Sequence, residues 1–358
     1  MPNFRRYNLL LAALLGPVVA LMVAASFFLQ PYDGDLTRLG GYPESLYGWQ
    51  APQKRFVPPL FRAFESAGAQ YLEPADVVIL GDSFTFRAQA SWADYLARAT
   101  GLRVQAFKLE AMTPNQLMQS DLFRRQPPRV VIYETTERSI KSRLRASGTS
   151  CRAAPDPAPA RLPRHPRSIE PEEVLRQARP VALDLSMSVD FLTKAIPRAL
   201  WGRDKTRVRR LVLTRDAAFS GVEKRQLLVY QDDLKKTQWT ASDWESARCR
   251  LMELQNAVQA NGQTYFMALI APDKLSAYDE LLADPSLKGL SHIDALARDP
   301  LLHLPRVDRV LRQAIGNGLI DVYLGNDTHW GSSGHELVAT SVVDALIRAG
   351  VLTPTKTP

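Results

Sequence analysis

A serine and a histidine near opposite ends of the chain are candidates for nucleophilic catalysis. Ser83 stands in a Gly-Asp-Ser-Phe-Thr segment directly after an apolar run, and His329 follows Asp327 by two positions. A serine hydroxyl is a weak nucleophile at neutral pH, so it needs a base within hydrogen-bond reach and a carboxylate that fixes the tautomer of that base. The three residues together predict a Ser-His-Asp triad for acyl transfer.

Each member of this set also has a plainer interpretation. A serine between a strand and a helix is often only a helix cap, so Ser83 alone would be a weak signal. Asp82, beside it, is expected to hold the turn by hydrogen bonding rather than to act chemically. His335 is a rival base, but His329 is preferred because Asp327 accompanies it. Asp232 and Asp233 predict a solvated charged turn.

The hydrophobic pattern predicts strands that alternate with helices. We expect strands over 76–80, 102–107, 129–133, 264–270 and 319–323, and helices over 92–100, 114–126, 242–261 and 333–349. A capping box of Ser333 and Glu336 is expected to start the last helix. This alternation favours a mainly parallel, doubly wound sheet, which binds ligands at the carboxyl ends of its strands. Ser83 and His329 both fall at such ends.

The chain divides by composition into four segments, one of which contains a large insertion. Residues 1–30 predict a membrane anchor or signal peptide, residues 31–71 a linker or lead-in, and residues 72–350 the catalytic domain, followed by a tail over 351–358. Residues 142–240 form a large basic insertion within that domain. Its Pro- and Arg-rich start predicts a loop, and a helical pattern resumes over 172–179. It could form a lid, a polymer-binding surface or a solvated decoration.

The N-terminus predicts where the protein works. The uncharged apolar stretch 9–29 is about long enough to cross a bilayer core, and Arg5 and Arg6 precede it. Positive charge on the short N-terminal side keeps that side cytoplasmic and sends the rest of the chain across the membrane. We therefore expect a single-pass protein of the bacterial inner membrane with its catalytic domain in the periplasm. The small residues at 23–26 leave a cleaved signal peptide as the alternative.

Charge limits the kinds of partner that the protein could bind, and the cysteines indicate its compartment. Residues 124–210 hold 20 Lys and Arg against 9 Asp and Glu, so this region could attract a polyanion. A cytoplasmic nucleic acid is not expected as that partner, given the N-terminal segment. Cys151 and Cys249 suit an oxidising compartment and could form one disulfide, or they could be two unrelated thiols. They do not resemble a zinc site, and no metal is expected.

Four segments of the chain resemble the SGNH hydrolase superfamily, specifically its alginate O-acetyltransferase-like branch. They are 81–84 (Gly-Asp-Ser-Phe), 133–138 (Tyr-Glu-Thr-Thr-Glu-Arg), 271–278 (Ala-Pro-Asp-Lys-Leu-Ser-Ala-Tyr) and 327–330 (Asp-Thr-His-Trp) with Gly334. The likeness covers roughly residues 72–348 apart from the insertion. The order of the segments differs, because alginate members place the serine after the Asp-x-His.

This resemblance implies a fold and roles for individual residues. The family has a flavodoxin-like three-layer α/β/α sandwich and uses no cofactor, and by it Ser83 is the nucleophile, His329 the base and Asp327 its orienting group. The oxyanion-hole Gly and Asn of the superfamily are not recognisable here. The donors would be the Ser83 N–H with Thr136, Arg138 or Arg87.

Three further residues could contact substrate by the same resemblance. Lys274 and Tyr278 could hold the acceptor sugar or the acyl donor, or they could be a structural pair. Trp330 could stack on a sugar ring or pack beneath its loop.

The function predicted from these observations is O-acetylation of a secreted or cell-surface polysaccharide through an acyl-serine intermediate. Expected partners are the polysaccharide acceptor, a membrane-bound O-acyltransferase that supplies acetyl groups, and a polysaccharide synthase or export complex. An SGNH acetyl-esterase that deacetylates polysaccharide would use the same triad with water as acceptor. A catalytically silent scaffold or carbohydrate-binding subunit of an exopolysaccharide assembly is the third alternative.

Overall fold

A five-stranded parallel sheet forms the centre of the protein. The computed structural model describes residues 4–28, 30–86, 91–146, 151–152, 161–176, 184–202, 206–216 and 218–354. In spatial order the strands are β2 (Arg62–Phe64), β4 (Val104–Lys108), β3 (Val77–Gly81), β5 (Val130–Thr136) and β9 (Tyr265–Ala271). Each neighbouring pair is parallel. The predicted mixed α/β fold with a mainly parallel sheet is confirmed.

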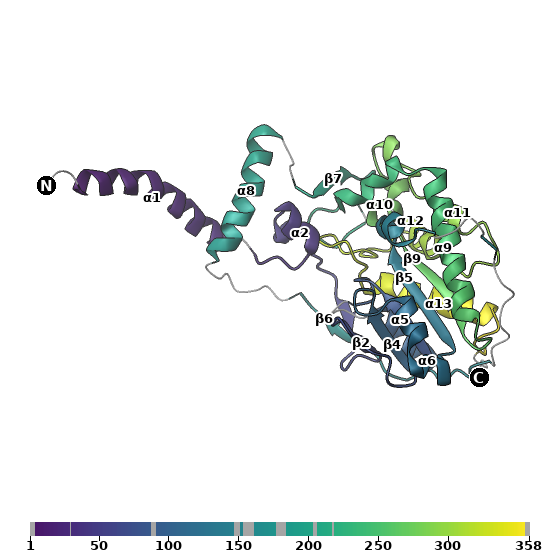
Figure 1. Cartoon of the computed structure of the whole chain (residues 1–358). Helices are drawn as coiled ribbons and strands as arrows, with labels where there is room; N and C mark the ends of the chain where they lie inside the picture. The colour runs from purple at the N-terminus through teal and green to yellow at the C-terminus, as the bar shows by residue number, and fades with distance from the viewer. Residues whose placement is uncertain are drawn as a thin grey trace.

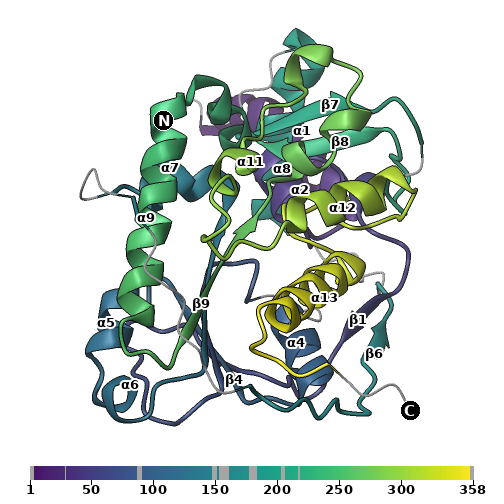
Figure 2. The ribbon, with the colours of Figure 1, turned by 90° about the vertical axis from the view of Figure 1, so that its right-hand side faces the viewer.

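Helices cover both faces of this sheet (Figure 2). Val77 and Ile79 enter one hydrophobic core and Val78 and Leu80 the other, because successive side chains of a strand point to opposite faces. A strand buried on both faces reads as a continuous apolar run, which is why these strands were recognisable. The first face carries α4 (Trp92–Thr100), α10 (Lys274–Ala277), α12 (Val307–Gly316) and α13 (Ser332–Arg348). The second carries α5 (Pro114–Gln119), α6 (Asp121–Arg125), α7 (Ile140–Arg143), α9 (Ala241–Gln259) and α11 (Ile293–Leu296).

The strand order places a topological switch point at the carboxyl end of β3. After β3 the chain moves to one side to form β4, and it then crosses back to form β5 on the other side. Open parallel sheets bind ligands in the crevice that such a reversal creates. Ser83 follows β3 by two residues and therefore lies at this point.

The predicted fifth strand at 319–323 is wrong. These residues form turns after α12, and only Tyr323 makes an isolated bridge, to Trp330. Asp321 has a φ of 52°, a left-handed conformation that does not continue a strand. A short apolar run cannot by itself distinguish a strand from a packed loop. The fifth strand is instead β2, within the segment expected to be a linker or lead-in.

Two helix boundaries also differ from expectation. The helix predicted over 114–126 is two helices, α5 and α6, because Ser120 is extended and its hydroxyl caps the second helix by accepting from the Phe123 N–H. The expected capping box at Ser333 is wrong. Helix α13 starts at Ser332 after Gly331, which makes no side-chain cap.

The segments outside the sheet form smaller paired elements. The lead-in contains α2 (Asp35–Gly40), α3 (Glu44–Tyr47) and β1 (Gln53–Arg55). Strand β1 pairs antiparallel with β6 (Glu172–Val174) of the insertion. The helix predicted from residue 172 is therefore wrong at 172–174. The insertion also contains α8 (Leu185–Trp201), an antiparallel pair of β7 (Val208–Val212) with β8 (Gln226–Tyr230), and the 3-10 helix η2 (Gln231–Gln238). In the tail, Leu352 is buried and bridges Leu162.

Helix α1 (Phe4–Phe28) extends away from the rest of the protein (Figure 1). Its residues Phe4–Ala24 are apolar and long enough to span a membrane, and none of that stretch is buried against the protein. Helix α8 lies against the end of α1 nearer the sheet (Figure 1). Apolar side chains of α8 are exposed, among them Leu185, Ile196 and Trp201.

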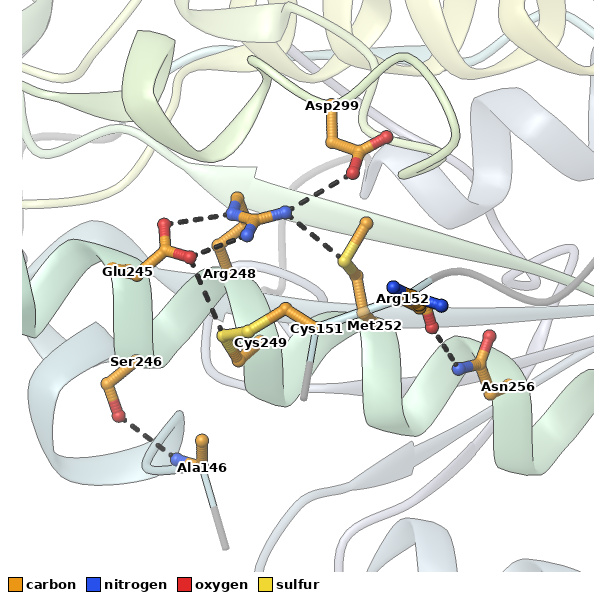
Figure 3. The surroundings of a disulfide bond; sticks show 10 residues. All are labelled: Ala146, Cys151, Arg152, Glu245, Ser246, Arg248, Cys249, Met252, Asn256 and Asp299. Carbon is orange, nitrogen blue, oxygen red and sulfur yellow. Dashed lines mark hydrogen bonds and ion pairs between the residues drawn. A yellow bond between two sulfur atoms is a disulfide. The ribbon is translucent and has the colours of Figure 1, made fainter. Parts of the chain in front are cut away.

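The two cysteines are joined in a disulfide (Figure 3). Cys151 follows α7 and Cys249 lies on α9, with their Cα atoms 4.7 Å apart. Two hydrogen bonds flank the bridge: the Ala146 N–H donates to Ser246 Oγ, and Asn256 Nδ2 donates to the Arg152 carbonyl. The start of the insertion is thereby attached to the helix that covers one face of the sheet.

Removing this disulfide should destabilise the protein. The bridge joins residues 98 positions apart, so its loss releases a long loop in the unfolded chain. We expect Cys151→Ser with Cys249→Ser to lower the free energy of unfolding by about 2–4 kcal/mol. Denaturant unfolding of the full chain in detergent, with and without reductant, measures this. A wild-type protein that reductant does not destabilise would contradict it.

Candidate active site

Ser83, His329 and Asp327 form a continuous hydrogen-bond chain at the switch point. His329 Nε2 lies 2.8 Å from Ser83 Oγ, and His329 Nδ1 lies 2.6 Å from Asp327 Oδ1. Asp327 Oδ1 also accepts from the His329 backbone N–H at 2.9 Å. With its proton on Nδ1, facing the carboxylate, His329 presents a free Nε2 lone pair to the serine hydroxyl. The three residues predicted as a triad thus have the geometry of a base-activated nucleophile.

The turn that carries Ser83 is held by the carboxylate of Asp82. Asp82 Oδ1 accepts from the Phe84 N–H at 3.1 Å, while Oδ2 accepts from the Thr136 N–H and from Arg143 Nη1, both at 2.8 Å. These bonds tie the turn after β3 to the end of β5. Asp82 therefore fixes the position of the nucleophile.

A wholly buried glutamate on β5, Glu134, also holds this turn. Glu134 Oε2 accepts from the Asp82 N–H at 2.8 Å and from Thr85 Oγ1 at 3.0 Å. Burial, followed by the nearby Asp82 charge, raises the pKa of Glu134 well above its usual value. A Cβ on Gly81 would lie 2.5 Å from Thr85 Oγ1, so only glycine fits at that position.

The loop that carries His329 is held by Lys274. Lys274 is wholly buried, and its Nζ donates to the carbonyls of Leu324 at 2.7 Å, Gly325 at 3.0 Å and Asp327 at 3.1 Å. Because all three of its ammonium hydrogens are bonded to loop carbonyls, Lys274 cannot hold a sugar or acyl donor. Tyr278 is also wholly buried and accepts from the Tyr323 N–H at 3.4 Å. The substrate-contact alternative is therefore wrong for both residues.

A second carboxylate reaches the triad from the lead-in segment. Asp35 Oδ1 accepts from the Thr328 N–H at 2.8 Å, and Oδ2 accepts from Thr328 Oγ1 at 2.6 Å and lies 3.8 Å from His329 Nδ1. The Asp35 N–H donates to Asp327 Oδ2 at 3.3 Å. Sequence reasoning missed Asp35, since its only signal is an acidic residue at the start of a short helix nearly 300 residues away.

The whole start of α2 binds this loop. The N–H groups of Leu36 and Thr37 both donate to the Asn326 carbonyl, at 3.0 and 3.2 Å. The first N–H groups of a helix have no acceptor within the helix itself, so they attract a carbonyl oxygen or an anion. The Asn326 side chain in turn donates to buried Glu44, which Arg176 of the insertion also contacts at 3.1 Å. The lead-in and the insertion thus both support the histidine loop.

Trp330 and His335 are packing residues. Trp330 is 1% exposed, and its ring lies 4.6 Å from the ring of Phe84 in an edge-on contact. It is therefore not available to stack on a sugar. His335 is wholly buried, and its Nδ1 accepts from the Trp92 N–H at 3.2 Å. The preference for His329 over His335 as the base agrees with these contacts.

The side chains proposed as oxyanion donors are used elsewhere. Thr136 Oγ1 donates to Ser139 Oγ at 2.8 Å, and Arg138 Nη1 contacts Asp273 at 3.2 Å and Asp233 at 3.4 Å. Arg87 lies outside the described residues. No acceptor among the described residues contacts the Ser83 N–H, which stays available to a developing oxyanion.

Arg138 belongs to a buried charge cluster at this edge of the sheet. Lys236 of η2 is buried, and its Nζ lies 2.9 Å from both Glu137 and Asp273. Asp233 is wholly buried as well, and burial raises its pKa to about 8. The prediction that Asp233 belongs to a solvated turn is wrong. These ion pairs fix η2 to the ends of β5 and β9.

Asp35, Asp327 and His329 could also hold a metal ion, because one ligand atom of each lies within 4.8 Å of the others. A metal ion on His329 Nδ1 would take the place of the proton that Asp327 now accepts. Metal binding there and base catalysis by His329 therefore exclude each other. The second such group, Cys151 with Glu245 and Cys249, has its sulfurs in the disulfide.

No protein-family model, no curated protein and no solved structure matches the chain.

Asp35→Asn should impair catalysis by displacing the histidine loop. The amide has one acceptor oxygen where the carboxylate has two, so it cannot accept from both the N–H and the hydroxyl of Thr328, and it carries no negative charge beside His329. A displacement of about 1 Å costs on the order of 10²-fold in turnover. Steady-state hydrolysis of an activated acetyl ester measures it, with the exposed Asp121→Asn as the matched control. Equal turnover in Asp35→Asn and wild type would contradict this role.

Lys274 should make stability depend on pH. Burial lowers its pKa to about 7 from a usual 10.5. Between these values the unfolded state holds one more proton than the folded state, so the free energy of unfolding rises with pH, by up to about 1.4 kcal/mol per unit. Below pH 7 both states are protonated and this contribution is flat. Denaturant titrations from pH 6 to 10 should show the slope in wild type and its loss in Lys274→Met. Parallel curves for the two proteins would refute the assignment.

Proposed function

We propose that the protein is an acyltransferase in which Ser83 is the nucleophile and His329 the general base. The observation that carries this is the unbroken chain from Ser83 Oγ through both nitrogens of His329 to Asp327. His329 Nε2 takes the hydroxyl proton as Oγ attacks the acyl carbonyl carbon, and the Ser83 N–H donates to the resulting oxyanion. Nε2 then returns the proton to the leaving group, and an acyl-serine remains.

We further propose that an acceptor hydroxyl completes the cycle. The hydroxyl gives its proton to His329 Nε2 and attacks the acyl carbon. The tetrahedral intermediate then collapses as Nε2 returns that proton to Ser83 Oγ, which releases Ser83 and the new ester. Ser83 is partly exposed, which supports access by an acceptor from solvent. The resemblance to the alginate O-acetyltransferase-like branch supports an acetyl group as the acyl unit and a polysaccharide hydroxyl as acceptor. It also supports an SGNH-type three-layer sandwich, with which the strand order and the two helical layers agree.

The proposed location is the inner membrane, with the sheet domain in the periplasm. Helix α1 with Arg5 and Arg6 at its start supports a single pass, and the disulfide supports an oxidising compartment. Helix α8, which contacts α1 and exposes apolar side chains, adds support for a surface that meets the membrane. A membrane-bound O-acyltransferase is the proposed acetyl source, and a polysaccharide synthase or export complex the proposed assembly.

Ser83→Ala and His329→Ala should each abolish turnover. Each change removes one member of a triad that acts as a unit, so we expect turnover to fall about 10³-fold or more. The assay uses the full chain in detergent with 4-methylumbelliferyl acetate as the acetyl donor. Ser142→Ala and His165→Gln are the matched controls. Acetylated oligosaccharide in the products supports transfer, whereas acetate release that an added oligosaccharide leaves unchanged supports hydrolysis. Turnover unaffected by both substitutions would contradict the triad.

A further inference from the structure

Helix α8 of the insertion has an exposed apolar side. Leu185, Val189, Ile196 and Leu200 follow one another at intervals of four, seven and four positions, which places them on one side of the helix. All four are exposed, and Leu200 has 67% of its surface open. We call these four residues the α8 stripe. Aliphatic side chains aligned in this way form an interaction surface, because covering them removes apolar area from water.

The charged residues of α8 lie on the opposite side of the helix. Asp190, Lys194 and Arg198 follow one another at intervals of four positions, so they share one side. Lys194 and Arg198 each stand two positions from Ile196, and residues two apart in a helix do not face the same way. Helix α8 is therefore amphipathic, with its charges and its exposed aliphatic side chains separated.

The charged side attaches α8 to the C-terminal end of α2. Lys194 Nζ donates to the Arg38 carbonyl at 2.8 Å. Arg198 donates to the carbonyls of Gly40 and Gly41. The last carbonyls of a helix have no donor within the helix itself, so these cations fill open positions. Helix α2 in turn contacts β7 and β8. The α8 stripe, on the other side of α8, thus faces away from α2.

The neighbour of α8 indicates what covers the stripe. Helix α8 contacts α1, and Figure 1 shows it crossing the end of α1 nearer the sheet. Within α1, Phe4–Ala24 is long and apolar enough to span a membrane. A helix that crosses the end of a membrane-spanning helix lies at the bilayer surface, where amphipathic helices bury their apolar side between headgroups and acyl chains. We propose that the α8 stripe is embedded in the surface of the leaflet from which α1 emerges.

This contact would set the distance between the triad and the membrane. Helix α2 has six residues and is about 9 Å long. Its C-terminal end is bound by α8, while Asp35 at its start binds Thr328 of the histidine loop. With α8 in the bilayer surface, one short helix separates the loop from that surface. Such a position suits an acyl donor that arrives from the membrane, a point that rests on the proposed function, whereas the lipid contact rests only on the membrane pass of α1.

Spin-label accessibility tests the proposal on the full chain in phosphatidylcholine nanodiscs with one chain per disc. The two native cysteines are joined in the disulfide, so a label reacts with a cysteine introduced by Ile196→Cys or Leu200→Cys. Molecular oxygen concentrates in the acyl region, whereas nickel ethylenediaminediacetate stays in water. We expect the ratio of oxygen to nickel accessibility to be severalfold higher at both positions than at control positions, because the stripe is immersed in lipid.

Trp201→Cys provides the matched control on the same helix. Trp201 is 64% exposed, close to the value for Leu200, but it lies one turn after Arg198 and therefore on the charged side. The exposed Arg124→Cys on α6 is the control on the sheet domain. Both control labels should be more accessible to the nickel complex than the stripe labels. Thermal unfolding of each labelled protein checks that the fold is retained.

Two results would overturn the inference. Stripe labels that the nickel complex reaches as readily as the Arg124→Cys label would show that the stripe lies in water. Stripe labels that neither reagent reaches would show that protein, and not lipid, covers them. A chain that does not enter nanodiscs would contradict the membrane pass of α1 together with the lipid contact. Ester turnover is not part of this measurement, so a failed triad and a failed lipid contact are separate results.

Discussion

The geometry of the site depends on the hydrogen-bond partners of one buried loop that has no regular secondary structure. Residues 324–330 carry both Asp327 and His329 without a regular strand or helix, so their carbonyls and N–H groups need other partners. Lys274 binds three of the carbonyls from inside the protein. The start of α2 binds another from outside, and Asp35 accepts from Thr328. These contacts help to keep the imidazole within reach of Ser83.

This arrangement links catalysis to the membrane-proximal part of the chain. Helix α2 begins only a few residues after α1, and Glu44 joins Asn326 of the loop to Arg176 of the insertion. The lead-in is therefore a structural part of the site, besides being a connection to the anchor. The charge cluster of Glu137, Lys236 and Asp273 likewise attaches a part of the insertion, η2, to the ends of β5 and β9. Burying such charges costs free energy, and it is tolerated only where the partners are close and well oriented.

Much of the central sheet could be predicted because its strands are buried on both faces. The runs that became β3, β9 and the first half of β5 are continuous stretches of apolar residues, and α4 has a capping serine and a terminal glycine. The short edge strand β2 has no such run, with only one apolar aromatic among Arg-Ala-Phe, and it was not recognised. The run at 319–323 was apolar for another reason, since Val322 and Tyr323 pack beneath the histidine loop.

The site was predictable where its residues are neighbours in sequence, and not where folding brings them together. Asp327 and His329 are two positions apart, and the serine turn follows a clear strand. Asp35, Glu134 and the function of Lys274 depend on contacts between distant segments, which no local pattern encodes.

The central claim is that Ser83 carries the acyl group. Acid-quenched mass spectrometry of the protein, mixed with an activated acetyl ester and then digested, tests this most directly. The account predicts an acetyl group on the peptide that contains Ser83 in wild type, and none on that peptide in Ser83→Ala or His329→Ala. Steady turnover of the ester by wild type without acetylation of that serine would contradict the account.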